Sequence, residues 1–302
     1  MPMISNNIDF IKNWKVSSFS HNAMNTVFQI FISGENEQYA EQVALEAFNE
    51  IDLLEDLLSR FRPNSDVSKI NSLNEGKYAV VGEDTFKCLA KAVELFDLTD
   101  GSFDISLGDE IQSWKDNKTS MNQPTQSKMH YLFLDPQNFT VLVNKKINLD
   151  LGGIGKGYAA EKIADIFTEW EITNYLINCG NSTVKVKSTD TKLSWPISLT
   201  NPITNKVFKE YTLENNSISS SGIKKGNHII DPATIAPIDN GRISCWVCSN
   251  DTIKTDVLST AFMILDQENI ENICSKDENL SCAILLEKNE TELITFGNFF
   301  KY

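Results

Sequence analysis

The segment Asp150-Leu-Gly-Gly-Ile-Gly-Lys-Gly-Tyr-Ala159 places four glycines within six residues, directly before a helical pattern. Glycine lets the backbone approach a ligand closely, and the first turn of a helix offers unpaired N–H groups to an anion. The order of the glycines matches neither the dinucleotide fingerprint GxGxxG nor the P-loop pattern GxxxxGKS/T. On its own, the segment therefore fits a phosphate site and a plain strand-to-helix turn equally well.

Apolar periodicity outside this segment predicts the secondary structure. Apolar residues at spacings of three and four predict a long helix over residues 37–61 and a second helix over residues 84–98. A helix over residues 156–170 begins within the glycine segment, and another is expected over residues 253–274. Residues 113–128 are polar and are expected to form a loop or a short excursion. Strands are predicted at residues 27–32, 131–134, 139–144, 174–178, 183–187, 194–199, 207–213, 243–248, 282–287 and 291–296.

Short turns between successive strands predict antiparallel pairing, because parallel strands need long crossover connections. The predicted fold class is therefore α+β, with largely antiparallel sheets and packed helices, rather than a doubly wound parallel sheet. No linker or low-complexity tract interrupts the 302 residues. We expect a single domain over residues 1–302, with two intimately packed α+β halves as the alternative.

The composition excludes several functional classes. A hydrophobic content of 41% and a charged content of 23% are typical of a globular protein. The net charge of −14, without a cluster of Lys and Arg, argues against a nucleic-acid partner. No apolar run approaches the roughly 20 residues of a membrane span, and the start lacks the basic and apolar regions of an export signal. We expect a soluble protein, cytoplasmic as the chain stands and periplasmic or membrane-anchored if an export segment has been removed.

Six cysteines are too sparse in a chain of this length for a disulfide scaffold, so free buried thiols are expected. Cys245 and Cys248 have the spacing of a redox or zinc motif, but they lie in a strand-like run. Residues three apart on a strand face opposite sides. We therefore expect structural roles for both cysteines.

Of the three histidines, His228 has the most suggestive surroundings. It lies in Ser219-Ser-Ser-Gly-Ile-Lys-Lys-Gly-Asn-His-Ile-Ile-Asp-Pro232, where small and basic residues precede a strand-like His-Ile-Ile. A general base could be placed there beside an anionic ligand. A hydrogen-bonded histidine in a surface loop is the alternative. His21 and His130 lack comparable surroundings, and structural roles are expected for both.

Asp256 and Thr260 lie four residues apart at the predicted start of a helix. Four residues are just over one helical turn, so the carboxylate and the hydroxyl project from the same face. Both are oxygen ligands of the kind that Mg²⁺ takes together with substrate phosphates. The alternative makes Asp256 a helix-start charge and Thr260 a hydroxyl bonded to the backbone.

Taken together and in order, these segments resemble the ApbE family of FAD:protein FMN transferases. The resemblance runs from about Met24 to Ile264, most of the chain. It rests on Met24-Asn-Thr26, Ser59-Arg-Phe-Arg-Pro-Asn-Ser-Asp-Val-Ser-Lys-Ile-Asn71, Asp100-Gly-Ser-Phe-Asp104, Asp150-Leu-Gly-Gly-Ile-Gly-Lys-Gly-Tyr-Ala159, Asn178-Cys-Gly180, Ser221-Gly222, His228-Ile-Ile-Asp-Pro232 and Asp256-Val-Leu-Ser-Thr260.

The resemblance implies an ApbE-like, T-fold-like architecture and a transfer reaction. Enzymes of this family split the FAD diphosphate with Mg²⁺ and attach FMN through a phosphoester to a Thr or Ser hydroxyl of a target flavoprotein, releasing AMP. By the same resemblance, Asp256, Thr260 and the backbone carbonyl of Gly155 would bind Mg²⁺, and His228 would be the candidate base. The flavin nucleotide would contact Met24, Ser102, Phe103, Asp104, Gly153, Lys156 and Tyr158.

The sequence also departs from the family pattern. Gly155 stands where the family often has Ala, a change that a backbone carbonyl ligand tolerates. Asn181 and Ser182 replace a second glycine and an acidic residue that frequently follow the Asn-Cys-Gly piece. The segment between Gly222 and His228 is shorter than the hairpin of many members. Two alternatives stay open, namely an FAD diphosphatase, in which water replaces the protein hydroxyl, and a non-catalytic FAD-binding protein.

Overall fold

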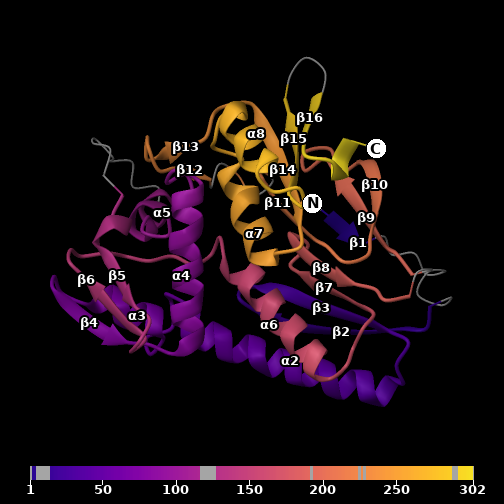
Figure 1. Cartoon of the computed structure of the whole chain (residues 1–302). Helices are drawn as coiled ribbons and strands as arrows, with labels where there is room; N and C mark the ends of the chain where they lie inside the picture. The colour runs from indigo at the N-terminus through magenta and orange to yellow at the C-terminus, as the bar shows by residue number, and fades with distance from the viewer. Residues whose placement is uncertain are drawn as a thin grey trace.

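An eight-stranded sheet forms the centre of the structure, a computed structural model that describes residues 2–4, 14–115, 127–190, 193–223, 226, 229–287 and 292–301 (Figure 1). In spatial order its strands are β16 (Glu292–Phe296), β15 (Ser281–Leu286), β14 (Arg242–Ser249), β11 (Ser217–Gly222), β8 (Thr183–Lys187), β7 (Tyr175–Cys179), β3 (Thr26–Ser33) and β2 (Val16–Ala23). Every pairing in this sheet is antiparallel. The predicted α+β class with largely antiparallel sheets is therefore confirmed.

The two faces of this sheet bury separate apolar cores, because successive side chains of a strand point to opposite faces. In β14, Cys245 and Val247 belong to one core, whereas Trp246 and Cys248 belong to the other. Cys245 and Cys248 thus face opposite sides of the sheet, as predicted. All six cysteines are buried and free, which confirms the expectation of unpaired thiols.

Four helices pack against one face of the sheet: α2 (Glu37–Leu58), α6 (Gly155–Glu169), α7 (Thr252–Ala261) and α8 (Gln267–Ser275). Figure 1 shows α6 and α7 in front of the strands and α2 crossing beside β2. The apolar stripe of α2 is buried, including Val43, Ile51 and Leu54. Burial of one helical face supplies most of the stability of such a helix.

A small antiparallel sheet covers the opposite face. It consists of β1 (Pro2–Ile4), β9 (Trp195–Thr200) and β10 (Val207–Leu213), in the order β1-β9-β10. Trp195 and Ile197 of β9 are buried in the second core together with Leu213 of β10. The central sheet is therefore enclosed between helices on one side and a second sheet on the other.

A smaller group of elements lies beside the central sheet and supplies one wall of the site. It contains α3 (Asp66–Ser72), β4 (Lys77–Val80), α4 (Glu83–Leu98), α5 (Gly108–Lys115), a 3-10 turn (Met129–Tyr131), β5 (Leu132–Asp135) and β6 (Thr140–Val143). The three strands form an antiparallel sheet in the order β4-β6-β5. Ser65 caps α3 by accepting a hydrogen bond from the amide of Ser68 at 2.9 Å. Short strands β12 (Ile230–Asp231) and β13 (Ala236–Pro237) and a terminal 3-10 turn (Phe299–Lys301) complete the chain.

Two helix predictions were wrong in their bounds. The helix predicted over residues 37–61 ends at Leu58, because Ser59 takes an extended conformation. The single helix predicted over residues 253–274 is two helices, since Asp266 caps α8 by accepting from the amide of Asn269. Of the polar stretch 113–128, residues 113–115 belong to α5 and residues 116–126 lie outside the described residues. No helix in the described part of the chain is both long and apolar enough to cross a membrane.

Candidate functional site

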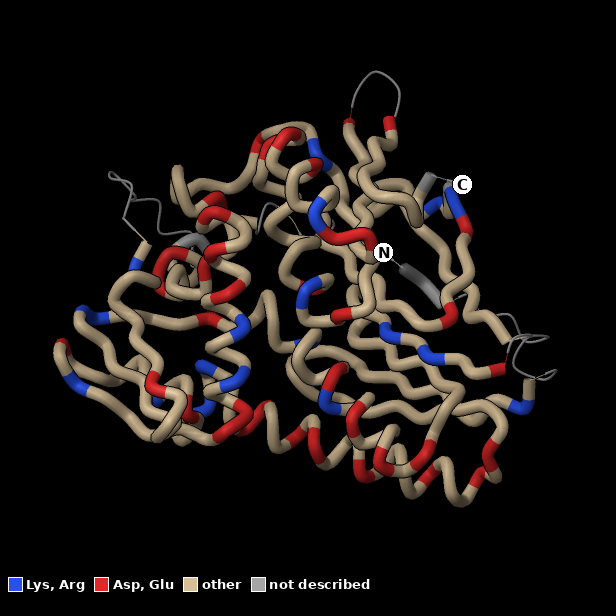
Figure 2. The backbone as a smooth tube through the Cα atoms, in the orientation of Figure 1, with Lys and Arg blue, Asp and Glu red and all other residues tan. Residues whose placement is uncertain are grey.

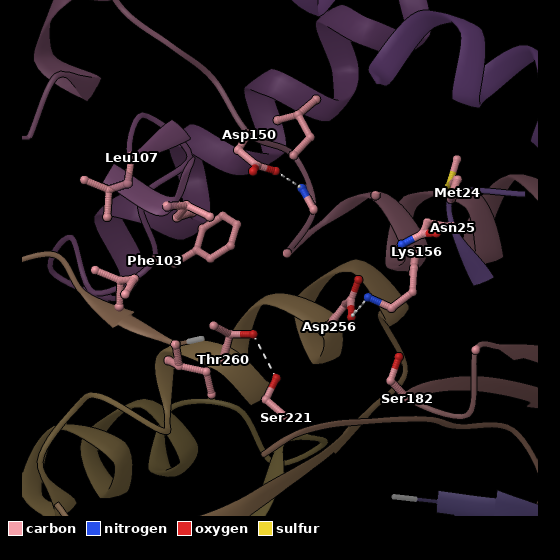
Figure 3. A pocket seen from close by; sticks show the side chains of 18 of the residues that line it. Met24, Asn25, Phe103, Leu107, Asp150, Lys156, Ser182, Ser221, Asp256 and Thr260 are labelled. Carbon is pink, nitrogen blue, oxygen red and sulfur yellow. Dashed lines mark hydrogen bonds and ion pairs between the residues drawn. The ribbon is translucent and has the colours of Figure 1, made fainter. Parts of the chain in front are cut away.

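A cavity of about 560 Å³ opens where the central sheet, helices α6 and α7 and the smaller group of elements meet (Figure 3). This volume lies in the range of small-molecule sites. Predicted residues that line it are Met24, Ser102, Phe103, Asp104, Gly153, Gly155, Lys156, Asp256 and Thr260. Segments that are far apart in the sequence are thus brought to one place.

Asp256 lies in the middle of α7, with only 5% of its surface exposed. Its Oδ2 accepts a hydrogen bond from the amide of Gly157 at 2.9 Å, and its Oδ1 accepts one from Thr183 Oγ1 at 2.8 Å. Lys156 Nζ lies 3.3 Å from the same Oδ1. The prediction that Asp256 sits at the helix start was wrong, because Asp251 caps α7. The carboxylate is instead a nearly buried group fixed by three polar partners.

Thr260 follows one turn after Asp256 and lines the same cavity, as the spacing of four predicted. Its Oγ1 lies 2.9 Å from Ser221 Oγ (Figure 3). Ser221 Oγ is also 3.0 Å from Ser259 Oγ. The hydroxyl of Thr260 is therefore hydrogen-bonded to the hydroxyl of Ser221 on β11. Further along the same strand and helix, Ser219 pairs with Thr255 and Ser217 with Thr252.

The glycine segment brings the backbone of α6 close to α7. A Cβ on Gly157 would lie 2.7 Å from the carbonyl oxygen of Thr252 and 2.9 Å from the Cβ of Asp256. Gly155 is different, because a Cβ there meets nothing within 4 Å. Gly155 begins α6, and its preceding residue, Ile154, makes no side-chain cap. The amides of Ile154 and Gly155 donate to the carbonyl of Leu151, and that of Gly157 donates to Asp256, so the start of this helix offers an open glycine surface at the cavity wall.

Phe103 and Asp104 form the opposite wall. The amide of Phe103 donates to Thr99 Oγ1 at 3.1 Å, which holds the turn after α4. The ring of Phe103 lies so close to Gly153 that an added Cβ would be 3.0 Å from it. Asp104 Oδ1 accepts from the amide of Ser106 at 2.7 Å, whereas its buried Oδ2 has no hydrogen-bond partner among the described residues. This wall combines an aromatic ring with an unused acceptor.

Met24 reaches the cavity from the tight turn between β2 and β3. Met24 and Asn25 have φ values of 50° and 56°, the two positive values of a type I′ hairpin turn. Residues other than glycine rarely adopt this conformation. Thr26, on the next strand, lies so close to Gly180 that an added Cβ would be 2.2 Å from its Oγ1. The hairpin and the turn after β7 are therefore packed together at the cavity.

Arg60 and Lys156 are the positively charged residues among those that line the cavity. Arg60 lies 3.3 Å from Asp150 Oδ2 and donates to the carbonyl of Gly108 at 2.8 Å. This arginine thereby links the exit of α2 to the glycine segment and to α5. Elsewhere Figure 2 shows acidic residues in succession along α2. Each of the two cavity cations is paired with a carboxylate of the lining, Arg60 with Asp150 and Lys156 with Asp256, and Glu55 and Asp104 also line the cavity.

Tyr158 is the predicted flavin contact that the structure places elsewhere. Its side chain is buried, is absent from the cavity lining, and donates its hydroxyl to Asp84 Oδ1 at 2.8 Å. Burial raises the pKa of Tyr158, and the hydrogen bond to Asp84 raises it further. Tyr158 is therefore a neutral donor that joins α6 to α4. A direct contact between its hydroxyl and a ligand in this cavity does not fit that geometry.

His228 lies outside the described residues. The residues Ile229, Ile230 and Pro232, which follow it in the sequence, line the cavity. Cys179 lies near Asp256, and burial raises the pKa of its thiol, with the Asp256 carboxylate raising it further. The thiol of Cys179 is therefore neutral at physiological pH.

Several cavity residues were not assigned to the site from the sequence. Phe61 was assigned to the apolar stripe of a helix, but it is 71% exposed and lies at the cavity. Ser182 lines the cavity at the turn where the sequence departs from the family pattern, while Asn181 instead bonds to Asn178. Most of these residues lie within the segments on which the resemblance rests. Membership of those segments was the feature of the sequence that could have identified them as site residues.

Comparison with known proteins agrees with this geometry. The sequence profile of the ApbE family matches residues 24–284. A FAD:protein FMN transferase of Buchnera aphidicola subsp. Schizaphis graminum is 30% identical over 263 residues, which cover 78% of this chain and 76% of that protein.

Solved structures show the same fold. The flavin transferase ApbE from Vibrio cholerae superposes with a TM-score of 0.82 at 20% identity, over 94% of this chain and 98% of that one. The ApbE protein from Thermotoga maritima gives a TM-score of 0.79 at 23% identity, over 95% and 98% of the two chains.

Proposed function

Because this chain belongs to the ApbE family, we propose that it transfers FMN from FAD to a Thr or Ser hydroxyl of a target flavoprotein. The hydroxyl oxygen forms a bond to the phosphorus of the FMN moiety. The bond between that phosphorus and the bridging oxygen of the diphosphate breaks, and AMP leaves. The hydroxyl proton goes to a base on the enzyme. The products are a phosphothreonyl- or phosphoseryl-FMN ester and AMP.

The observation that carries this proposal is the meeting of Asp256, Thr260 and Gly155 in a cavity that also contains Phe103 and Asp104. Asp256 and Thr260 present oxygen atoms, and Gly155 leaves open space beside them, which suits a diphosphate with its counter-ion. The other two present an aromatic face and an unpartnered acceptor, which suits a heterocycle with an N–H group. One cavity thus offers a polar end and an aromatic end, as FAD requires.

The residues present fit Mg²⁺. A nearly buried carboxylate and a hydroxyl, Asp256 and Thr260, line the wall beside the backbone of Gly155. The described residues contain no group of three or more His, Cys, Asp or Glu side chains arranged for a metal. This agrees with a Mg²⁺ site completed by substrate phosphates rather than by a protein cage. Bound there, the ion would neutralise charge on the diphosphate as AMP leaves.

The protein's own side chains bind and orient the nucleotide in this proposal. Lys156 and Arg60 attract the diphosphate, and the positive end of the α6 dipole lies at the same cavity wall. Phe103 and Met24 exclude water from the flavin ring. We propose His228 as the base that takes the hydroxyl proton, a contribution of about 10² to 10⁴-fold.

The acceptor is proposed to be a flavoprotein with a flavinylation motif that presents a Thr or Ser. The test is to incubate the chain with FAD, Mg²⁺ and such a flavoprotein, and to follow fluorescent flavin that survives denaturation. Retained flavin on the acceptor supports transfer. Conversion of FAD to FMN and AMP without an adduct on any such acceptor indicates a diphosphatase, and tight FAD binding without turnover indicates a binding protein.

A further inference from the structure

Lys156 and Asp256 form an ion pair on the wall of the cavity, at 3.3 Å between Nζ and Oδ1 (Figure 3). The side chain of Lys156 is 22% exposed, whereas that of Asp256 is 6% exposed. Both residues line the cavity. The pair therefore joins a nearly buried carboxylate to an ammonium group that is accessible from the cavity.

The other partners of Asp256 are neutral. The amide of Gly157 and the hydroxyl of Thr183 donate to its two oxygens, and the tight crossing at Gly157 fixes the position of the carboxylate. Among the described ion pairs, Lys156 is the cation that neutralises Asp256. A carboxylate removed from water and left without a counter-ion is strongly destabilised.

A divalent cation bound to Asp256 would supply the same neutralisation with twice the charge. An ammonium group a few ångströms away would then repel the divalent ion, because like charges at this separation repel each other strongly inside a protein. Lysine has a flexible stem and a compact charge, and Lys156 lies where its amine can turn toward an anion in the cavity. A divalent ion would therefore compete with the Lys156 ammonium group for the Asp256 carboxylate.

We propose that Lys156 is an exchangeable counter-ion. It neutralises Asp256 while no divalent cation is bound, and it is released when the ion binds, so that its amine becomes available to the diphosphate of the nucleotide. This inference rests on the proposed function for the identity of the site. Lys156 thereby couples metal binding to nucleotide binding, because the ion frees the charge that the nucleotide then uses.

Lys162 provides a matched control. It lies on the same helix, α6, is 29% exposed, and pairs with Asp84 at 3.0 Å and Glu50 at 3.8 Å. It does not line the cavity. Lys156→Met and Lys162→Met remove the same charge from the same helix, but only the first removes a competitor of the divalent ion.

The experiment titrates each protein with Mn²⁺ in the absence of FAD and measures free Mn²⁺ by electron paramagnetic resonance. Lys156→Met is expected to bind one Mn²⁺ at least tenfold more tightly than the unsubstituted protein, and Lys162→Met is expected to match the unsubstituted protein. Unchanged or weaker binding by Lys156→Met contradicts the proposal, and so does the absence of binding in all three proteins.

A second measurement needs no substitution. Limited acetylation followed by mass spectrometry reports the reactivity of each lysine amine in the unsubstituted protein. Addition of Mn²⁺ without FAD is expected to raise the labelling rate of Lys156 severalfold relative to Lys162. An equal rate with and without Mn²⁺ contradicts release. Neither measurement uses turnover, so failure of FMN transfer with tightened Mn²⁺ binding would overturn the proposed function and leave the exchange intact.

Discussion

The amide of Gly157 donates a hydrogen bond of 2.9 Å to Oδ2 of Asp256, across 99 residues of sequence. This bond joins helix α6 to helix α7 at the point where an added Cβ on Gly157 would collide with both the backbone and the side chain of α7. The glycine segment thus lets two helices pack closely at Gly157, while Gly155 leaves open space at the cavity. Substitutions at Gly157 and at Gly155 can separate the effect on helix packing from the effect on the cavity.

Gly157→Ala is expected to force α6 and α7 apart, because its Cβ would lie 2.7 Å from the carbonyl of Thr252. Overpacking of this kind costs about 1–3 kcal/mol. Gly155→Ala is the matched control, since a Cβ there meets nothing within 4 Å. Urea unfolding should show a loss of stability for Gly157→Ala and none for Gly155→Ala, with FAD turnover kept only by the latter. Equal stability of the two variants would refute the close crossing.

Asp256→Asn is expected to abolish Mg²⁺-dependent release of AMP from FAD, because the amide cannot replace the charged metal ligand. It is also expected to lower the free energy of unfolding by about 1–3 kcal/mol, since an amide cannot satisfy all three polar partners of the carboxylate. Chromatographic AMP assays and urea unfolding measure the two effects. Unchanged Mg²⁺ dependence in a folded Asp256→Asn protein would remove Asp256 from the metal site.

Ser221→Ala removes the hydroxyl that lies 2.9 Å from Thr260 Oγ1. We expect a higher Mg²⁺ concentration for half-maximal turnover, because Thr260 loses the partner that orients its hydroxyl. Ser217→Ala on the same strand is the control, since its partner is Thr252 rather than a proposed ligand. That control should lose stability without changing the Mg²⁺ requirement. If both variants shift the Mg²⁺ requirement equally, the effect is one of general stability.

Asp66→Asn tests a buried carboxylate at the start of α3, outside the cavity lining. Burial raises the pKa of Asp66, but hydrogen bonds from Gly82, Lys69 and Thr85 outweigh it, and the pKa lies below its ordinary value of 3.8. A lowered pKa adds stability at pH above 3.8, and this stability is lost as the pH falls through the folded-state pKa. Urea unfolding at about pH 7, 5 and 3.5 should show a deficit for Asp66→Asn that shrinks at the lowest pH. A deficit that does not change with pH would contradict this.

Much of the fold could be predicted because its elements carry strong apolar patterns. The buried stripe of α2 and the alternating strand β14 are examples. Strand β11 was missed for a physical reason. Its buried Ser217 and Ser219 pair with hydroxyls of α7 rather than with apolar side chains, so no hydrophobic alternation marks it. Helices α7 and α8 were merged because apolar residues continue through the turn that separates them.

The site was partly predictable for a different reason. The spacing of Asp256 and Thr260 predicted a shared face, which the cavity confirms. Spacing could not show that Asp256 is nearly buried or that Lys156 pairs with it, because these contacts depend on how α6 crosses α7. Phe61 was assigned to a helix that ends three residues earlier. The spacing of apolar residues gives no indication that Ser59 adopts an extended conformation and ends the helix.

The transfer of FMN to a protein hydroxyl is tested most directly by the intact mass of an acceptor flavoprotein incubated with this chain, FAD and Mg²⁺. The proposal predicts that the acceptor gains the mass of one FMN less one water, with one AMP released per molecule modified and no gain when the acceptor Thr or Ser is replaced by Ala. AMP formation at the same rate with or without acceptor, with no change in the acceptor's mass, would contradict it.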